Sequence, residues 1–356
     1  MQAAVYSFSR RGAELSKHVR DILVNLGYSV RTETMKKFAG EMGLEPMEPD
    51  HHGACANAFK DCQAVVFVGA TGIAVRTIAP LLKSKAVDPA VLSIDERANF
   101  VIPLVAGHIG GANELARVMA QHLGAQACVT TATDVNGLFA VDEWAARNKM
   151  VLCSLKAAKD FAAALVQGEE VGLYTDYPVS GFLPKQIKHY QGNEQYNTGM
   201  AVTLDKECQP FPVTVKLLPK IVHLGIGCRR GISLEAIEAL VLPELARLGL
   251  DHRTIVRVAS VDLKKDEQGL RAFAEKYHWP TVFYTAAELQ AVEGNFTASK
   301  FVQSVIGVSN VCERAAVCSS GQGELLLHKT SLNGVTLAVA REKITLDLNK
   351  TGLKSE

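Results

Sequence analysis

Residues 100–124, FVIPLVAGHIGGANELARVMAQHLG, decide the fold of this chain. The run Phe100–Val105 has the length and composition of a strand, and three glycines around His108 follow it. Apolar residues then recur at helical spacing, so that Leu115 and Met119 fall on one face of a helix. Because the first N–H groups of a helix lack partners, a strand–turn–helix segment of this kind suits an anionic ligand.

Strands and helices alternate on both sides of this stretch. Further strands are predicted at Ala3–Ser7, Ala64–Val68, Val91–Ile94 and Ala127–Thr131, and helices at Gly12–Leu26 and Ile73–Lys83. This alternation predicts an α/β fold: a mostly parallel, doubly wound sheet with ligand loops at the carboxyl ends of its strands.

A chain of 356 residues is too long for one ordinary hydrophobic core. The alternation of predicted strands and helices weakens near residue 146 and resumes near residue 219. We predict an N-terminal α/β domain at 1–145, a small middle module or elaborated linker at 146–218, and a separate α/β C-terminal domain at 219–345. The middle segment would act as a spacer or a lid. After residue 141 the predicted helices are Asp142–Lys149, Leu155–Val166, Leu234–Leu248, Gln268–Tyr277 and Val305–Ala316, and the predicted strands are Val171–Thr175, Ala201–Leu204, Ile221–Leu224, Ile255–Leu263, Thr281–Tyr284, Leu325–Thr330 and Val335–Arg341.

The composition excludes several classes of partner. Lys and Arg total 38 against 37 Asp and Glu, so a net charge of +1 gives no attraction to nucleic acid or to an anionic membrane. No apolar run reaches the length of a membrane span, and MQAAVYSFSRRG contains no signal-peptide core. The eight cysteines are scattered without a C-x-x-C pair, which favours reduced thiols over disulfides or a zinc site. We therefore expect a cytoplasmic protein without a metal site of its own.

Three glycine-rich turns are candidate binding loops: GATGIAVR (69–76), AGHIGGAN (106–113) and GIGCRRGIS (225–233). Each would offer backbone N–H groups, and two add arginine, which suits an acidic small molecule. The dinucleotide pattern G-x-G-x-x-G is only approached, because the third glycine arrives one residue late at Gly231. The predicted substrate-binding residues are Gly69, Thr71, Gly72, Arg76, Gly107, Gly110, Gly111, Asn113, Thr131, Gly225, Gly227, Cys228, Arg229 and Arg230.

His108 is the candidate general acid or base, because a histidine between glycines at a strand end is accessible and titrates near neutrality. The alternative is a histidine that only hydrogen-bonds the backbone of its turn. Glu114 and Asp134 are the candidate assisting carboxylates, with helix-end and capping roles as their alternatives. Cys228 would have a lowered pKa beside a helix end and two arginines, which makes a nucleophilic thiol a further alternative.

Two sets of motifs resemble the cobalt-precorrin-5A hydrolase family of anaerobic cobalamin (vitamin B12) biosynthesis. The N-terminal set is VFVGATGIAVRTIAPLLKSKAVDPAVLSIDE, PLVAGHIGGANELA and TTATDVNGLFAVDEWA, and the C-terminal set is HLGIGCRRGIS, VASVDLKKDEQGL and GVSNVCERAAV. The resemblance is specific over about residues 64–146 and 221–341, and faint elsewhere.

The resemblance implies a substrate and a reaction. The substrate would be a cobalt-bearing, ring-contracted tetrapyrrole with a δ-lactone; water opens the lactone, and a two-carbon unit leaves as acetaldehyde. The resemblance does not assign these steps to individual side chains. From the residues themselves we expect His108, assisted by Glu114 or Asp134, to move protons, and Arg76, Arg229, Arg230 and the turn glycines to hold carboxylates. No cofactor is needed, because the cobalt belongs to the substrate. Transient contacts with other enzymes of the pathway and a homodimer both stay open.

Three rival functions remain at this point. The first is a carrier that binds the tetrapyrrole without catalysis, the second is a nucleotide-dependent α/β enzyme, and the third is a lactonase that uses Cys228 through a thioester.

Overall fold

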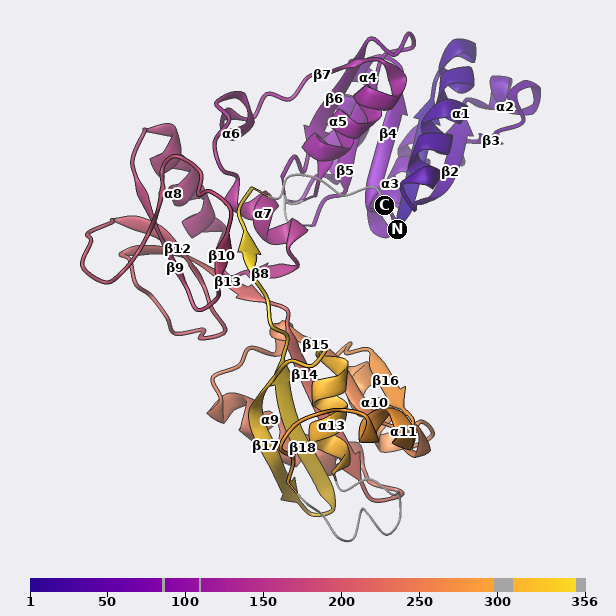
Figure 1. Cartoon of the computed structure of the whole chain (residues 1–356). Coiled ribbons are helices and arrows are strands. Elements are labelled where there is room, and N and C mark those ends of the chain that lie inside the picture. Colours follow the sequence, from indigo (N-terminus) through magenta and orange to yellow (C-terminus); the bar gives the residue numbers. More distant parts are fainter. Residues whose placement is uncertain (85–86, 109, 298–309, 350–356) are drawn as a thin grey trace. The chain divides into compact units, whose positions relative to one another are not determined.

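The computed structural model describes residues 1–84, 87–108, 110–297 and 310–349, which belong to two compact units (Figure 1). Among the described residues, the first unit contains 1–144 and the second contains 145–349.

The first unit is built on a mostly parallel sheet, with seven strands among its described residues. In sheet order they are β3 (Glu45–Pro46), β2 (Ser29–Thr34), β1 (Gln2–Ser7), β4 (Ala64–Val68), β5 (Ala90–Ile94), β6 (Phe100–Val105) and β7 (Gln126–Ala127). The strands from β3 to β5 run parallel, whereas β6 is antiparallel to β5, and β7 follows the direction of β6. This reversal at β6 decides where the loop after it lies.

Helices cover both faces of this sheet. They are α1 (Arg10–Asn25), α2 (Lys36–Met42), α3 (His51–Asp61), α4 (Thr71–Ile78) and α5 (Ala112–Leu123), followed by the short α6 (Ala132–Val135) and α7 (Val141–Arg147). Neighbouring strand residues point to opposite faces, so Val5 packs with Leu23 of α1 and Met119 of α5, whereas Tyr6 packs with Ala54 of α3 and Ile78 of α4. The predicted α/β class, with a doubly wound N-terminal part, is confirmed.

Helix α5 begins and ends at glycines in the left-handed conformation. Gly111 precedes it with φ 79° and Gly124 follows it with φ 66°, which a residue with a Cβ adopts only with strain. Its buried side carries Leu115 and Met119, as the spacing predicted, and also Ala116.

The second unit contains two five-stranded sheets among its described residues. In sheet order the first contains β11 (Ile187–His189), β9 (Val171–Thr175), β12 (Thr198–Val202), β13 (Val213–Pro219) and β8 (Met150–Leu152), and helix α8 (Leu155–Val166) packs on it. Its strands are parallel except β8, which is antiparallel to β13.

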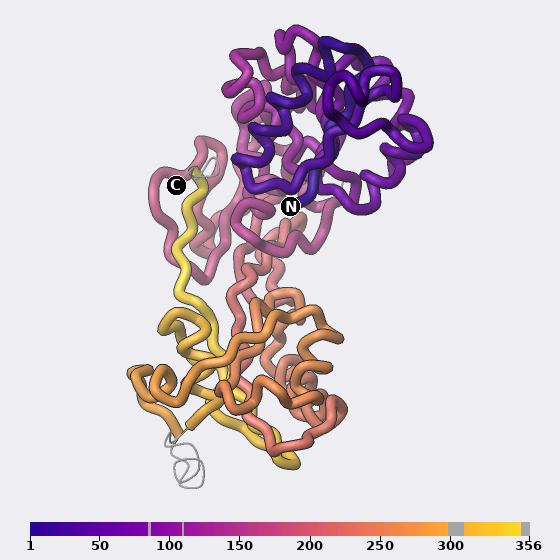
Figure 2. Tube along the Cα trace, turned by 90° about the vertical axis from the view of Figure 1, so that its right-hand side faces the viewer, coloured from indigo at the N-terminus to yellow at the C-terminus, as the bar shows by residue number. Residues whose placement is uncertain are grey.

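The other sheet of this unit contains β16 (Thr281–Tyr284), β15 (Ile255–Val261), β14 (Val222–Cys228), β18 (Val335–Arg341) and β17 (Glu324–Leu332). The first three are parallel, and β17 and β18 form an antiparallel hairpin. The associated helices are α9 (Leu234–Arg247), α10 (Gln268–Lys276), α11 (Ala286–Gln290) and α13 (Val311–Ser319). Strand β19 (Leu346–Asp347) then pairs with β10 (Val179–Ser180), so the yellow end of the chain runs beside an earlier segment of the same unit (Figure 2).

Several predicted elements match the structure to the residue. They are the strands Ala64–Val68, Phe100–Val105, Val171–Thr175, Thr281–Tyr284 and Val335–Arg341 and the helix Leu155–Val166. The predicted strand Ala127–Thr131 is wrong, since β7 ends at Ala127 and Thr131 precedes helix α6. Of the predicted helix Val305–Ala316, residues 305–309 lie outside the described residues, and α13 begins at Val311.

The predicted glycine-rich turn at 225–233 is also partly wrong, because Gly225, Gly227 and Cys228 lie inside strand β14. The reason is close packing: a Cβ on Gly225 would lie 1.9 Å from the backbone oxygen of Cys312 in α13. Here glycine lets a helix backbone approach the strand. Within the described ranges, no helix is both long and apolar enough to cross a bilayer.

Substitution at Gly225 tests this packing. Gly225→Ala should destabilise the second unit by about 3 kcal/mol, because the new methyl group meets backbone atoms that cannot move aside. Gly40→Ala is the matched control: Gly40 is exposed within α2 with open space around it, so alanine should stabilise that helix by up to about 1 kcal/mol. Thermal unfolding of both variants, followed by circular dichroism, compares them. An unchanged transition in Gly225→Ala would contradict the close approach of α13 to β14.

Candidate functional site

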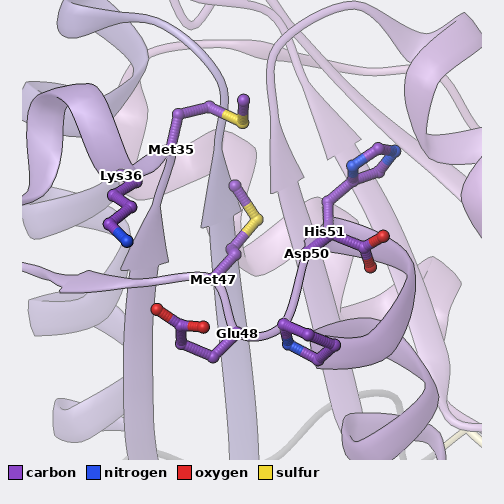
Figure 3. Close-up of a pocket in the computed structure, with 7 residues that line it drawn as sticks. Met35, Lys36, Met47, Glu48, Asp50 and His51 are labelled. Carbon is purple, nitrogen blue, oxygen red and sulfur yellow. The ribbon is translucent and has the colours of Figure 1, made fainter.

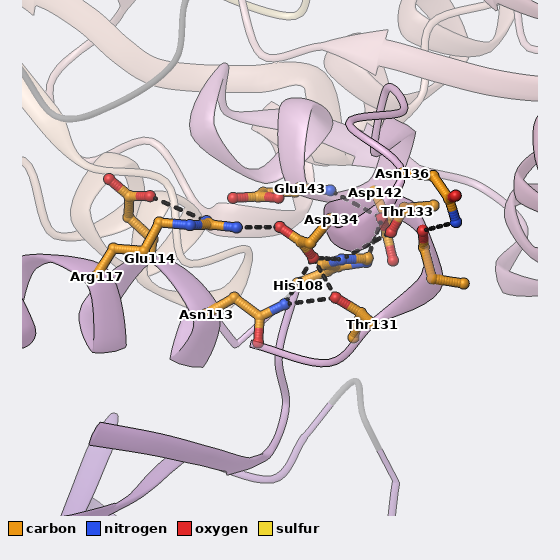
Figure 4. Close-up of polar contacts among 11 residues, drawn as sticks. His108, Asn113, Glu114, Arg117, Thr131, Thr133, Asp134, Asn136, Asp142 and Glu143 are labelled. Atoms are coloured by element: carbon orange, nitrogen blue, oxygen red, sulfur yellow. Dashed lines mark hydrogen bonds and ion pairs between the residues drawn. The ribbon is translucent and has the colours of Figure 1, made fainter. Parts of the chain in front are cut away.

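His108 lies between two carboxylates of the first unit (Figure 4). Its Nε2 is 2.9 Å from Oδ2 of Asp134, and its Nδ1 is 3.2 Å from Oδ1 of Asp142. Thr133 Oγ1 lies 3.2 Å from the same Nε2. The ring therefore bonds side chains from α6 and α7. The alternative, a histidine that only hydrogen-bonds the backbone of its own turn, is wrong.

These carboxylates change the protonation of His108. The hydrogen bond with Asp142 is the largest influence and, with Asp134, outweighs burial to raise the pKa of His108 to about 9. The predicted titration near neutrality is wrong for this reason. At neutral pH His108 is an imidazolium, with both N–H groups directed at carboxylates and 17% of the side chain exposed.

Asp134 is the anchor of the cluster. It accepts hydrogen bonds from Asn113 Nδ2 at 2.9 Å, from Thr131 Oγ1 and from Arg117 Nη2, in addition to the contact with His108. Burial alone would raise the pKa of Asp134, but the bonds from Thr131, His108 and Arg117 lower it to about 2. Asp134 therefore orients its neighbours and favours the protonated form of His108. Because its own pKa is about 2, it is too weak a base to accept a proton at neutral pH.

Helix α5 supplies the remaining members. Asn113 is 2% exposed and also donates to Thr131 Oγ1 at 3.1 Å. Arg117, one turn further on, joins Asp134 to Glu114, whose Oε2 lies 3.5 Å from Arg117 Nη1. Glu114 thus enters the cluster through the guanidinium. Asp142 and Glu143 come from α7, and Glu143 is 8% exposed.

The glycines of the turn make room for this cluster. A Cβ on Gly107 would lie 2.8 Å from Oδ1 of Asn113, and one on Gly110 would lie 2.4 Å from the Cβ of Ala106. The predicted anion cradle is not open, however. The N–H groups of Gly111, Ala112 and Asn113 donate to the carbonyl groups of His108, Ala106 and Gly107. These three amides close the turn on itself and are not free for an anion. A part of Gly107, Gly110, Gly111, Asn113 and Thr131 in binding the substrate stays a prediction.

The turn at 69–76 lies at the other edge of the same sheet. Val68, which precedes Gly69, pairs with Ile94, whereas Val105, which precedes the His108 turn, pairs with Val91. Because β6 runs antiparallel, its carboxyl end lies beside the amino ends of β4 and β5, a strand length of roughly 10–15 Å away. The structure thus does not bring Gly69, Thr71, Gly72 or Arg76 together with His108. Thr71 instead bonds Ser93, and Arg76 is exposed.

A pocket of about 180 Å³ lies near that other edge, beyond the ends of β2 and β3 (Figure 3). Figure 3 shows the side chains of Met35 and Met47 pointing into it, with His51 at its side. Its volume is well below that of a pocket for a drug-sized ligand, so it does not enclose a macrocycle.

The glycine-rich residues of the second unit have structural partners. Gly231 N–H donates to Glu267 Oε2 at 2.9 Å, and Arg229 N–H donates to the Gly334 carbonyl. Burial raises the pKa of the Cys228 thiol to about 11, so the lowered pKa predicted for it is wrong. Arg229 and Arg230 are exposed, and their part in binding stays a prediction, as does that of Gly225 and Gly227.

Three of these side chains have the donor types of a metal site: ligand atoms of His108, Asp134 and Glu143 lie within 4.8 Å of one another. Both ring nitrogens of His108 face carboxylates, and Asp134 is saturated by Arg117, Asn113 and Thr131. A cation would have to displace these internal partners, so the arrangement favours an imidazolium over a metal ion as the local positive charge.

Sequence reasoning missed Arg117 and Glu143 and did not include Asp142 in the site. Arg117 had a detectable signal, since it lies four residues after Asn113 and therefore on the same face of α5. The two acidic residues follow a segment without clear periodicity, so their approach to His108 is a tertiary contact without a local pattern.

Comparison with known proteins matches both ends of the chain. The model described as "Cobalamin synthesis G N-terminal" matches residues 53–134, and "Cobalamin synthesis G C-terminus" matches residues 222–340. A cobalt-precorrin-5A hydrolase from Salmonella typhimurium is 37% identical over 310 residues, covering 84% of this chain and 88% of that protein. One from Priestia megaterium is 30% identical over 356 residues, covering 95% and 94%. Protein CobE from Sinorhizobium sp. is 30% identical over 128 residues, covering 36% of this chain and 83% of that protein.

The raised pKa of His108 predicts a pH-dependent stability of the first unit. The protonated ring is stabilised in the fold, so this contribution, about 3 kcal/mol, is complete below pH 6.5 and is lost as the pH rises through about 9. His108→Gln should remove that slope between pH 6.5 and 9, whereas His122→Gln, at an exposed position of α5, should keep it. Denaturant unfolding of both variants across this range measures the difference. A titration midpoint of His108 near 6.5 by NMR would refute the two-carboxylate explanation.

Proposed function

The chain belongs to the family of cobalt-precorrin-5A hydrolases of cobalamin synthesis, and from this premise we propose that it opens the lactone of cobalt-precorrin-5A and releases acetaldehyde, with His108 as proton donor. The observation that carries the role of His108 is its position between Asp134 and Asp142, at 2.9 and 3.2 Å. Two carboxylates hold the ring as a cation, and a cation with N–H groups is a general acid.

The proposed chemistry has two steps. Hydrolysis of the lactone adds one water, breaks the ester C–O bond and leaves a carboxylate and a hydroxyethyl group. Removal of the hydroxyl proton then lets the C–C bond break: acetaldehyde leaves, and the electron pair enters the macrocycle. One proton must return to the carbon that lost the two-carbon unit. The proton lost from the hydroxyl group balances the proton gained at this carbon. The protonation state of the protein is therefore the same before and after the reaction.

His108 suits the second proton transfer. Its pKa of about 9 keeps it charged at neutral pH, and the 17% of its side chain that is exposed gives a substrate access to the ring. When it gives up its proton, Asp134 and Asp142 favour its reprotonation. Asp134, with its lowered pKa and four donors, is a positioning residue, and Glu114 acts on it through Arg117.

No protein-bound cofactor takes part in this proposal, because the cobalt and the electron-accepting macrocycle are both parts of the substrate. The eight cysteines are free thiols, which supports a reducing compartment and thus the cytoplasm as the location. A homodimer and transient contacts with other enzymes of the pathway stay predictions. The favoured alternative function is a carrier that binds the same tetrapyrrole without converting it.

The test is incubation of the protein with the cobalt-bearing lactone, with acetaldehyde measured enzymatically and the pigment followed by its absorption spectrum and mass. His108→Gln should lower acetaldehyde release by about 100-fold or more, since a positioned acid contributes this much. His122→Gln is the matched control and should release acetaldehyde at the parent rate. Stoichiometric binding of the pigment without acetaldehyde would favour the carrier, and parental release by His108→Gln would remove His108 from the mechanism.

Asp142 gives a second test with a readout in pH. Asp142→Asn removes the largest influence on the His108 ring, so the pKa of His108 should fall from about 9 toward 6.5. The rate of acetaldehyde release should then decline at a lower pH than in the parent protein. A pH–rate profile recorded from pH 6 to 10 checks this, and an unshifted alkaline limb would show that His108 is not the titrating acid.

A further inference from the structure

The second unit contains a buried histidine that the proposed proton transfer does not use. His223 of β14 is 0% exposed, and both of its ring nitrogens have a side-chain partner. Nδ1 lies 2.7 Å from Oγ of Ser319, the last residue of α13, and Nε2 lies 2.8 Å from Oε1 of Glu342, which directly follows β18. A hydroxyl, an imidazole and a carboxylate thus form one continuous chain of hydrogen bonds.

The direction of these bonds follows from the groups themselves. A carboxylate only accepts, so His223 carries its proton on Nε2 and donates it to Glu342. In the neutral ring Nδ1 then has a free lone pair, which accepts the hydroxyl proton of Ser319. This is the relation of nucleophile, base and orienting acid that activates serine in hydrolases, with the two ring nitrogens exchanged.

The surroundings keep the ring neutral. Burial lowers the pKa of His223, and the charge of Arg257 on the neighbouring strand also lowers it. Glu342 raises the pKa, but by less than these two effects lower it. A neutral imidazole has the lone pair that a base requires, in contrast to the charged ring of His108.

Ser319, the last residue of α13, and Ser320, which follows it, differ in role. Ser320 is 4% exposed, and its hydroxyl donates to the carbonyl of Val317, as in an ordinary helix end. Ser319 is partly exposed, and Glu342 is 39% exposed at the other end of the chain of bonds. The residue at the hydroxyl end of this chain of bonds is therefore partly exposed, whereas the imidazole at its centre is buried.

We propose that Ser319, His223 and Glu342 form a nucleophilic serine site for ester carbonyl groups, and that the ester it opens is the substrate's lactone. The identity of that ester rests on the proposed function, whereas the reactivity of the serine does not. Ser319 Oγ attacks the carbonyl carbon, and His223 takes the hydroxyl proton and passes it to the lactone oxygen as the C–O bond breaks. Water then hydrolyses the acyl-serine ester, which releases the carboxylate and restores the serine, so one water is consumed overall.

A fluorophosphonate probe tests the reactivity without a corrinoid, since an activated serine displaces its fluoride and keeps the phosphonate. The full-length protein should be labelled at Ser319, as located by mass spectrometry of its peptides. Ser319→Ala should abolish the label, and His223→Gln should slow labelling by about 100-fold or more. Glu342→Gln, a change at a partly exposed position, should slow it by about 100-fold or more, because the ring then loses the carboxylate that fixes its tautomer.

Two controls decide whether Ser319 is labelled because it is activated or only because it is exposed. Ser331 of β17 is exposed, and Ser331→Ala should leave the label at Ser319 unchanged. Cys318 is the residue before Ser319, so Cys318→Ala excludes capture by the thiol and should also keep the label. Absence of label from Ser319, or labelling that is as fast in Glu342→Gln as in the parent protein, would overturn the proposed site.

The lactone assay then separates this inference from the proposed function. Ser319→Ala should leave the lactone closed, with no gain of 18 mass units, whereas His108→Gln should accumulate the opened, acetaldehyde-retaining pigment. If the parent protein is labelled at Ser319 but does not convert the lactone, the proposed function fails and the serine site stands. If Ser319→Ala opens the lactone at the parent rate, the serine is not its nucleophile and the inference fails while the proposed function stands.

Discussion

The carboxylate of Asp134, which bonds side chains from three segments, holds the site of the first unit together. It is 10% exposed, and its donors come from separate segments: His108 from the glycine turn, Asn113 and Arg117 from α5, and Thr131 from the residue before α6. An unpaired carboxylate in such surroundings would cost about 3–5 kcal/mol, so these segments cannot separate without that loss. The position of His108 follows from this constraint, and its charge follows from Asp142 and Asp134 together.

The reversal of one strand decides which residues share a site. Had β6 run parallel to β5, the turn after Val105 would lie beside the turn after Val68, at the carboxyl edge where doubly wound sheets bind ligands. Because β6 returns after a short turn at 95–99, His108 lies at the opposite edge. That edge is completed by α6 and α7, so the acid–base cluster uses a different set of neighbours from the one that the sheet order alone favours.

Local patterns in the sequence therefore predicted the positions of strands and helices better than the contacts between them. Apolar runs bounded by glycine located β4 and β6 to the residue, and helical spacing located α8, because burial of one face is a local property. The turn amides at Gly111 to Asn113 were expected to be free, but they bond to carbonyl groups three to six residues earlier, which no spacing rule reveals. Cys228 was expected beside a helix end, but it lies on a strand where burial raises its pKa to about 11.

The two histidines show how similar partners give opposite chemistry. His108 has carboxylates on both ring nitrogens and keeps some exposure, so attraction outweighs desolvation and the ring is an acid. His223 has one carboxylate, a hydroxyl on its other nitrogen, a nearby Arg257 and complete burial, so desolvation prevails and the ring is a base. Opening an ester requires a base at a nucleophile, and returning a proton to carbon requires an acid, and no single imidazole is best suited to both at one pH. A chain that carries both states, one ring held charged by two carboxylates and the other held neutral by burial, meets the two requirements with two histidines.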